Sequence, residues 1–144
     1  MHKDLLQELK EKIEPIFSED KRIICAYLFG SSATGMVHKR SDLDLAILLD
    51  PEKVKTFCLD DLLNLEVKLT LALKTERYDF VVCNKASLIL KFRIISTGKI
   101  IYNINDALRC EFEERTMQEY YDFLPRLNEF NREYFLALRE EYKK

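Results

Sequence analysis

The sequence has little glycine, little proline and no long apolar run, and each shortage excludes a class of architecture. With three glycines and three prolines in 144 residues, the chain has no flexible linker of the kind that separates domains. No apolar segment approaches the roughly 20 residues that a membrane-spanning helix needs. The N-terminus, MHKDLLQELKEK, is charged and lacks the apolar stretch of a signal peptide. We therefore expect one soluble domain, located in the cytoplasm, without a membrane partner.

Strong positive charge and clustered cysteines are also missing. The formal net charge is -2, which argues against extended nucleic-acid binding because such interfaces need a strongly basic face. A local basic pocket for one nucleotide stays open. The four cysteines form no CxxC pair and no Cys/His cluster, so a zinc site is not expected. Reduced thiols are the expected state in a cytosolic protein.

The chain does contain short apolar runs that alternate with segments of helical periodicity. The predicted strands are 22–30, 42–49, 77–83 and 99–103. The predicted helices are 3–17, 60–73, 86–95 and a segment from about 105 to 142 that Pro125 interrupts. Asp60 is the expected N-cap of the second helix, whose apolar face consists of Leu62, Leu65, Leu69 and Leu73.

This order of elements, α-β-β-α-β-α-β-α, predicts an α/β (α+β) fold, with a small mixed β-sheet and flanking helices. We assign residues 1–104 to a core. Residues 105–144 form a C-terminal helical extension that is packed on this core within a single domain. The direction of the first strand relative to the second stays open.

Two aspartates open the second predicted strand. Asp42 and Asp44 are two residues apart, so their side chains leave the same face of a strand. Two carboxylates this close repel each other, and burying them costs several kcal/mol unless a positive charge lies between them. Mg²⁺ meets this need, because it binds one or two carboxylates together with substrate phosphates and water. The pattern therefore predicts a magnesium site at the start of this strand.

A third aspartate, Asp79, interrupts the apolar run YDFVV. If that strand lies beside 42–49, Asp79 points toward the same site. Three aspartates can hold two metal ions roughly 3.5–4 Å apart, an arrangement that serves phosphoryl transfer. One of them can also accept a proton from an attacking hydroxyl. Taken alone, Asp79 is also consistent with a salt bridge at a strand edge, to Arg77 or Lys99, although this is the less favoured alternative.

The first predicted strand ends at Gly30-Ser31. A strand that ends in glycine and small residues lets backbone N–H groups approach a phosphate closely, and the Ser31 hydroxyl adds a donor. A Gly-Ser turn alone is weak evidence, since Ser31 could simply cap a helix. The combination of Gly-Ser, ten residues, Asp-x-Asp and a later strand aspartate is much more specific.

This combined pattern resembles the signature of the polymerase-beta-like nucleotidyltransferase superfamily. The segments YLFGSSATG, SDLDLAILLD, YDFVV, LKFRIISTGKIIYN and YYDFLPRLNEFNREY are similar to its minimal nucleotidyltransferases (MNT), the antitoxin halves of HEPN–MNT toxin–antitoxin pairs. The resemblance implies a nucleotidyltransferase fold. It also implies transfer of AMP from ATP, with two Mg²⁺ per site, onto a tyrosine of a HEPN ribonuclease toxin.

The resemblance also assigns roles to residues. Gly30 and Ser31, with Asp42 and Asp44, would bind the nucleotide. Asp42, Asp44 and Asp79 would be the metal ligands and the catalytic residues.

One departure from the family pattern concerns the cations. Many relatives carry arginines where this chain has Ser32 and Thr34, so two charges that could face the triphosphate are missing. Three residues just downstream could compensate: His38, Lys39 and Arg40. Lys91, Arg93 and Lys99 are expected to form a solvated face.

Two rival functions stay open: an antitoxin that neutralises its toxin by binding alone, and a transferase for a small, aminoglycoside-like molecule. Little chain remains after the core to enclose an acceptor, which favours an acceptor carried by another macromolecule. The C-terminal segment has aromatic residues at helical spacing, which either pack in a core or bind a partner: Tyr120, Tyr121, Phe123, Phe130, Tyr134 and Phe135. Assembly with a second copy or with a partner stays open.

Overall fold

The computed structural model describes residues 2–30 and 43–142. The predicted element order and the α/β fold class are confirmed. The helices and strands are α1 (His2–Phe17), β1 (Ile23–Phe29), β2 (Leu43–Leu49), α2 (Leu59–Leu73), β3 (Tyr78–Val82), α3 (Leu88–Thr97), β4 (Lys99–Asn103) and α4 (Asp106–Tyr142). Two short 3-10 turns, η2 (Val54–Thr56) and η3 (Cys83–Lys85), complete the described elements.

The four strands form one mixed sheet in the order β3-β2-β1-β4. β1 is antiparallel to both β2 and β4, whereas β2 and β3 are parallel. The direction that the sequence left open is therefore antiparallel. β3 and β4 are the two edges of the sheet, so two strands separate Lys99 on β4 from Asp79 on β3, and a salt bridge between them is excluded.

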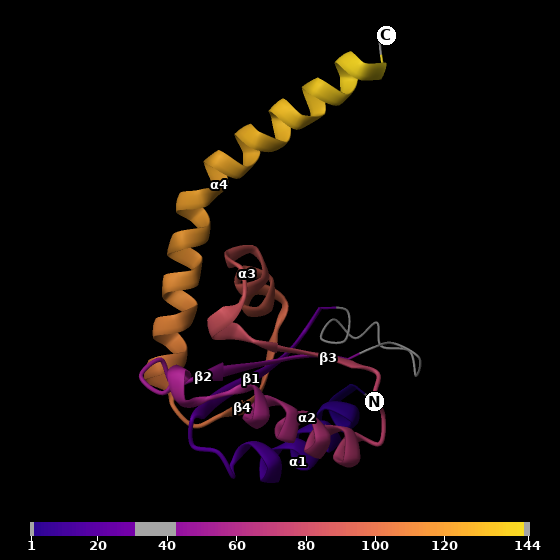
Figure 1. Cartoon of the computed structure of the whole chain (residues 1–144), viewed down its shortest axis with the longest axis vertical. Helices are drawn as coiled ribbons and strands as arrows, with labels where there is room; N and C mark the ends of the chain where they lie inside the picture. The colour runs from indigo at the N-terminus through magenta and orange to yellow at the C-terminus, as the bar shows by residue number, and fades with distance from the viewer. Residues whose placement is uncertain (1, 31–42, 143–144) are drawn as a thin grey trace.

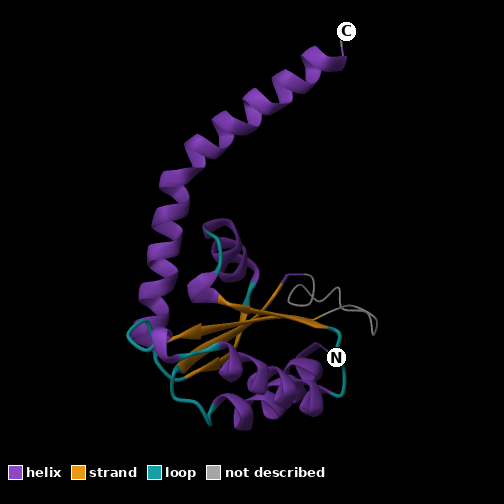
Figure 2. Cartoon of the chain, viewed as in Figure 1, coloured by secondary structure: helices purple, strands orange, loops and turns teal. Residues whose placement is uncertain are grey.

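Helices cover both faces of this sheet (Figure 2). α1 and α2 pack on one face through a cluster that includes Phe17, Leu45 and Leu69, all buried. α3 and the first part of α4 cover the other face, where Tyr27 and Ile94 are buried. Side chains alternate along β2, so Leu45 and its neighbours two residues apart face α1 and α2. Asp44 consequently lies on the face that α3 covers.

The start of α2 differs from the prediction. The N-cap is Cys58, not Asp60, because the Asp61 carboxylate accepts a hydrogen bond from the Cys58 backbone N–H (3.0 Å) and closes a capping box. Asp60 lies in the first turn instead, where a negative charge is favourable to the helix dipole.

α4 is a continuous helix of 37 residues that runs through Pro125, where the sequence predicted an interruption. Proline removes one backbone hydrogen bond, which bends a helix that has other support. Figure 1 shows α4 bent along its length, with its C-terminal part extending away from the sheet. Where α4 passes α3, Tyr120 stacks on Phe92 of α3, with ring centroids 3.7 Å apart.

The aromatic row of α4 therefore divides in two. Tyr120 packs against the core as predicted, whereas Tyr121, Phe130, Tyr134 and Phe135 are exposed. For these four residues the core interpretation is wrong in this chain, and the partner-binding interpretation keeps its physical basis.

The four cysteines are free thiols, as expected. Cys25 and Cys83 are buried, and burial raises the pKa of the Cys25 thiol to about 12, so it stays protonated and behaves as a small core residue. Of the helices that the structure describes, none has both the length and the apolar character needed to cross a membrane.

Candidate active site

Asp44 and Asp79 lie side by side on neighbouring strands. β2 and β3 are in parallel register, with Asp44 paired to Asp79. Paired residues of adjacent strands project from the same face of a sheet. Asp79 is exposed at the sheet edge, and Asp44 is half-buried one strand further in. The predicted condition, that the YDFVV strand lies beside the Asp-x-Asp strand, is therefore confirmed in position.

Gly30 lies directly against the Asp44 carboxylate. Phe29, the last residue of β1, pairs with Asp44, and Gly30 follows with a φ of +69°. A Cβ at this position would lie 2.5 Å from Asp44 Oδ2, nearer than a real Cβ approaches a neighbouring atom. Glycine is thus required here twice, for the left-handed backbone and for the space beside the carboxylate oxygen.

The last turn of α3 forms another wall of this site. The Gly30 N–H donates to Thr97 Oγ1 (3.2 Å), and the Thr97 hydroxyl donates to the Arg93 carbonyl (2.7 Å). Arg93 Nη2 lies 3.4 Å from the position that a Cβ would take at Gly30. The Arg93 guanidinium and the Asp44 carboxylate therefore approach the same glycine.

Sequence reasoning missed Arg93 and Thr97. It placed Arg93 on a solvated face, and the Arg93 side chain is exposed, but helical spacing does not reveal that this part of the helix lies next to Gly30. The available signal was the short link between the third helix and the strand that follows it, which brings the end of α3 back to the sheet. The sequence predicted that backbone N–H groups of the Gly30-Ser31 turn bind phosphate. The Gly30 N–H is not one of these groups, because it already donates to Thr97.

Part of the predicted set lies outside the described residues. These residues are Ser31, Ser32, Thr34, His38, Lys39, Arg40 and Asp42. Within 2–30 and 43–142, no group of three or more His, Cys, Asp or Glu side chains is placed to hold a metal ion. Asp44 and Asp79 nevertheless fit a hard, oxygen-binding cation such as Mg²⁺, which prefers carboxylate oxygens, and Gly30 leaves space beside one of those oxygens.

The alternative role of Asp79, a salt bridge at the strand edge, is not found. Asp79 forms no ion pair with any residue that the structure describes. Arg77 is exposed, and its backbone N–H donates to Thr75 Oγ1 (3.0 Å).

A second pair of aspartates brackets an arginine at the base of α2. Arg22 Nη2 lies 2.7 Å from Asp20 Oδ2, and Nη1 lies 3.2 Å from Asp61 Oδ2. Nη1 also donates to the Thr56 carbonyl (2.8 Å), and the guanidinium lies 5.0 Å from the Phe57 ring centroid. The hydrogen bond from Arg22 holds the pKa of Asp20 below its ordinary value. These contacts connect the start of α2 to the residues just before β1, and the Arg22 guanidinium is hydrogen-bonded within the chain.

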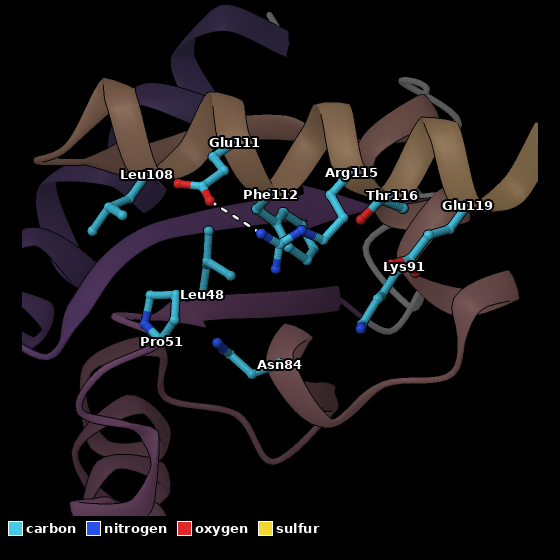
Figure 3. A pocket seen from close by; sticks show the side chains of 10 residues that line it. All are labelled: Leu48, Pro51, Asn84, Lys91, Leu108, Glu111, Phe112, Arg115, Thr116 and Glu119. Atoms are coloured by element: carbon cyan, nitrogen blue, oxygen red, sulfur yellow. Dashed lines mark hydrogen bonds and ion pairs between the residues drawn. The ribbon is translucent and has the colours of Figure 1, made fainter.

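A separate cavity of about 250 Å³ lies between α4 and the far end of β2 (Figure 3). Leu48, Leu108 and Phe112 form its apolar part. Its charged groups largely offset one another, since Arg115 pairs with Glu111 (3.1 Å). Leu48 is four residues along β2 from Asp44, about 13 Å at the rise of a strand. This cavity is therefore not part of the carboxylate site.

Comparisons with known proteins identify the family and the fold of the chain. Residues 11–107 match the family model described as "Polymerase beta, Nucleotidyltransferase". Among curated proteins none matches the chain. Among solved structures, a toxin–antitoxin with AMP-PNP is 24% identical, with a TM-score of 0.73 over 88% of this chain and 98% of that chain.

Two further complexes share the fold. One contains a tri-AMPylated HEPN toxin from Shewanella oneidensis with its MNT antitoxin (21% identity, TM-score 0.70, 90% of this chain and 98% of that chain). The other is a MntA-HepT toxin–antitoxin (22% identity, TM-score 0.68, 90% and 98%). The family model spans more than half of the sequence, and the chain therefore belongs to the polymerase beta nucleotidyltransferase family.

Proposed function

We propose that this chain is a Mg²⁺-dependent nucleotidyltransferase that transfers AMP from ATP to a tyrosine hydroxyl of a partner HEPN toxin, and thereby acts as an antitoxin. The observation that carries the chemistry is the pairing of Asp44 with Asp79 beside Gly30. The nucleotide and the acceptor are supported by two structural neighbours, one with AMP-PNP and one with a tri-AMPylated toxin.

Asp42, Asp44 and Asp79 would hold two Mg²⁺ ions. When bound, Mg²⁺ neutralises the negative charge of the phosphates and of the leaving pyrophosphate. Asp79 is exposed at the sheet edge, where an acceptor carried by another protein can approach. It is therefore the carboxylate that we assign to accept the proton of the attacking hydroxyl.

Arg93 would supply a cation that the phosphate loop lacks. Its guanidinium reaches Gly30 from α3, at the strand end after which the Ser31 turn would receive the phosphates. Arginine suits this role because its planar donor fork matches phosphate oxygens. Thr97 would act as a positioning residue, since its hydroxyl holds the Gly30 N–H.

The C-terminal part of α4 would bind the partner. Tyr121, Phe130, Tyr134 and Phe135 are each at least half exposed, and aromatic residues of this kind anchor protein interfaces. The same observation favours a second candidate function, neutralisation by binding alone, because this surface does not depend on the carboxylates.

The test first requires a HEPN protein encoded beside this chain, and then incubation of the pure protein with Mg²⁺, ATP and that HEPN protein, read by intact mass. We expect the HEPN protein to gain AMP units with the wild type and to gain none with the folded Asp42→Asn, Asp44→Asn double variant. A matched control is Asp60→Asn, an exposed aspartate of α2 that should leave transfer unchanged. Stable complex formation without any mass gain would favour binding alone. Full activity in the folded double variant would refute the metal assignment.

Truncation after Pro125 separates the partner surface from the nucleotide site. We expect the truncated chain to lose most of its affinity for the HEPN protein and to keep its affinity for Mg-ATP, both measured by calorimetry. The full-length Tyr134→Ala, Phe135→Ala variant should weaken partner binding in the same direction. Equal loss of both affinities would show that this part of α4 supports the core instead.

A further inference from the structure

α2 exposes a straight row of large apolar side chains. Leu59, Leu63, Val67 and Leu71 are 68%, 48%, 59% and 73% exposed. A spacing of four residues places them in one row along the helix surface. The buried residues of the same helix, Leu65 and Leu69, already supply its contact with the sheet. The exposed row, which we call the α2 row, is therefore apolar surface that folding of one chain does not use.

Three residues of the α2 row, Leu63, Val67 and Leu71, are arranged symmetrically about Val67, whereas Leu59 has no apolar counterpart, because position 75 is a threonine. Leu63 and Leu71 lie four residues before and after Val67, and Asp60 and Lys74 lie seven residues before and after it. When two α2 helices run antiparallel with a two-fold axis at Val67, Leu63 of each copy meets Leu71 of the other. Asp60 of each copy then lies at the register position of Lys74 of the other. A two-fold interface repeats each contact, so two pairs of opposite charges would flank the apolar centre.

We propose that the α2 row binds a second copy of this chain in an antiparallel, two-fold arrangement. Rows of residues four apart on one helix fit the grooves between the same rows on another. Asp60 and Lys74 are exposed and form no ion pair with any residue in the described part of the chain. Asp61, the neighbour of Asp60, is by contrast paired with Arg22.

The dimer would leave the other surfaces of the molecule accessible. α2 lies on the opposite side of the sheet from α3 and α4 (Figure 1), and Asp44 faces the α3 side. Dimerisation through α2 is therefore independent of the proposed transfer reaction and can be tested separately from it. The surface area of this one short row is smaller than the roughly 800 Å² that each partner contributes to a standard interface. We thus expect a weak dimer whose population rises with protein concentration.

The experiment is sedimentation equilibrium of the full chain from low to high micromolar concentration. The wild type should pass from monomer to dimer, and Val67→Glu should remain a monomer across the same range, because two carboxylates would meet at the axis. Ile89→Glu is the matched control: Ile89 is 52% exposed on α3, and this variant should dimerise like the wild type.

Charge reversal tests the register. Asp60→Lys or Lys74→Asp alone should weaken dimerisation by about tenfold, because each replaces two attractions with two repulsions. The double variant Asp60→Lys, Lys74→Asp should return to within about threefold of the wild type. Thermal unfolding by circular dichroism checks that every variant is folded.

Three results would overturn the proposal. The first is a wild type that stays monomeric at every concentration. The second is a dimer that Val67→Glu leaves intact. The third is that wild type and Val67→Glu show the same oligomeric state, while only Val67→Glu fails to bind the HEPN protein. That result would assign the α2 row to the HEPN partner.

Discussion

The molecule holds two pairs of aspartates that use the same chemistry in opposite ways. Asp20 and Asp61 stand on either side of Arg22, within 3.2 Å of its guanidinium. Asp44 and Asp79 instead occupy paired positions on adjacent strands, and Asp79 has no cationic partner among the described residues. In the first pair the countercharge is part of the chain. In the second, two carboxylates lie side by side on neighbouring strands, an arrangement that suits a shared divalent cation.

This difference separates structural acids from candidate functional acids. Carboxylates that share an arginine gain hydrogen bonds on folding and stabilise the elements that carry them. Adjacent carboxylates repel each other, and a divalent cation bound between them offsets this repulsion. Substitutions should therefore affect stability at the first pair and activity at the second.

The largest effect is expected for Asp79→Asn. We predict that AMP transfer falls by about a thousandfold, within the range for loss of a general base, because amide nitrogen and oxygen neither accept the proton nor neutralise Mg²⁺. Stability should stay within about 0.5 kcal/mol, since Asp79 is exposed. Asp61→Asn should do the reverse, lowering the urea midpoint and leaving the transfer rate per folded molecule unchanged. A loss of activity in both variants would remove the distinction between the two pairs.

Gly30→Ala should disturb the second pair by geometry alone. The new methyl group would meet Asp44 Oδ2, and alanine would have to adopt a φ of +69°. We expect a loss of stability of about 1–2 kcal/mol and a drop in transfer of about tenfold, because the Asp44 carboxylate must move. Urea unfolding and initial rates measure the two effects. Wild-type rates in a destabilised variant would show that the position of Asp44 next to Gly30 is not needed for transfer.

The sequence predicted much of this arrangement because local patterns encode it. Short apolar runs identified the four strands that the structure describes, and Asp79 was expected near the Asp-x-Asp strand on the condition that the two strands are neighbours. That condition is a matter of strand order, which no local pattern specifies. The approach of Arg93 and Thr97 to Gly30 likewise depends on where α3 ends over the sheet.

The α2 row was missed for a different physical reason. Helical spacing correctly assigned Leu65 and Leu69 to the core, but a helix that is apolar around most of its surface gives no single face to choose. Only the packed structure shows that Leu59, Leu63 and Val67 face outward. The start of α2 at Cys58 rather than Asp60 is a similar case. Asp60 and Asp61 are both acids that could cap a helix, and the sequence does not show that Asp61, which also contacts Arg22, is the one that bonds to the Cys58 N–H.

Arg22→Ala tests the first pair directly. Removal of the guanidinium leaves Asp20 and Asp61 without their shared cation and also removes the donor to the Thr56 carbonyl. Hydrogen bonds to charged groups contribute about 1.5–3 kcal/mol when buried, and partial exposure reduces this, so we expect a loss of about 1–2 kcal/mol. Transfer per folded molecule should not change. The matched control is Lys68→Ala, whose pair with Glu19 is exposed and should contribute less than about 0.5 kcal/mol.

The smallest expected effect is a pH dependence of stability that comes from the first pair. Because Arg22 lowers the pKa of Asp20, folding favours the ionised carboxylate. That contribution is complete above the ordinary carboxyl pKa of about 3.9 and is lost as the pH falls through the lower folded value. The free energy of unfolding in urea should therefore decrease more between pH 5 and pH 2 in the wild type than in Arg22→Ala. Parallel curves for wild type and Arg22→Ala would mean that the Asp20–Arg22 pair does not stabilise the fold through charge.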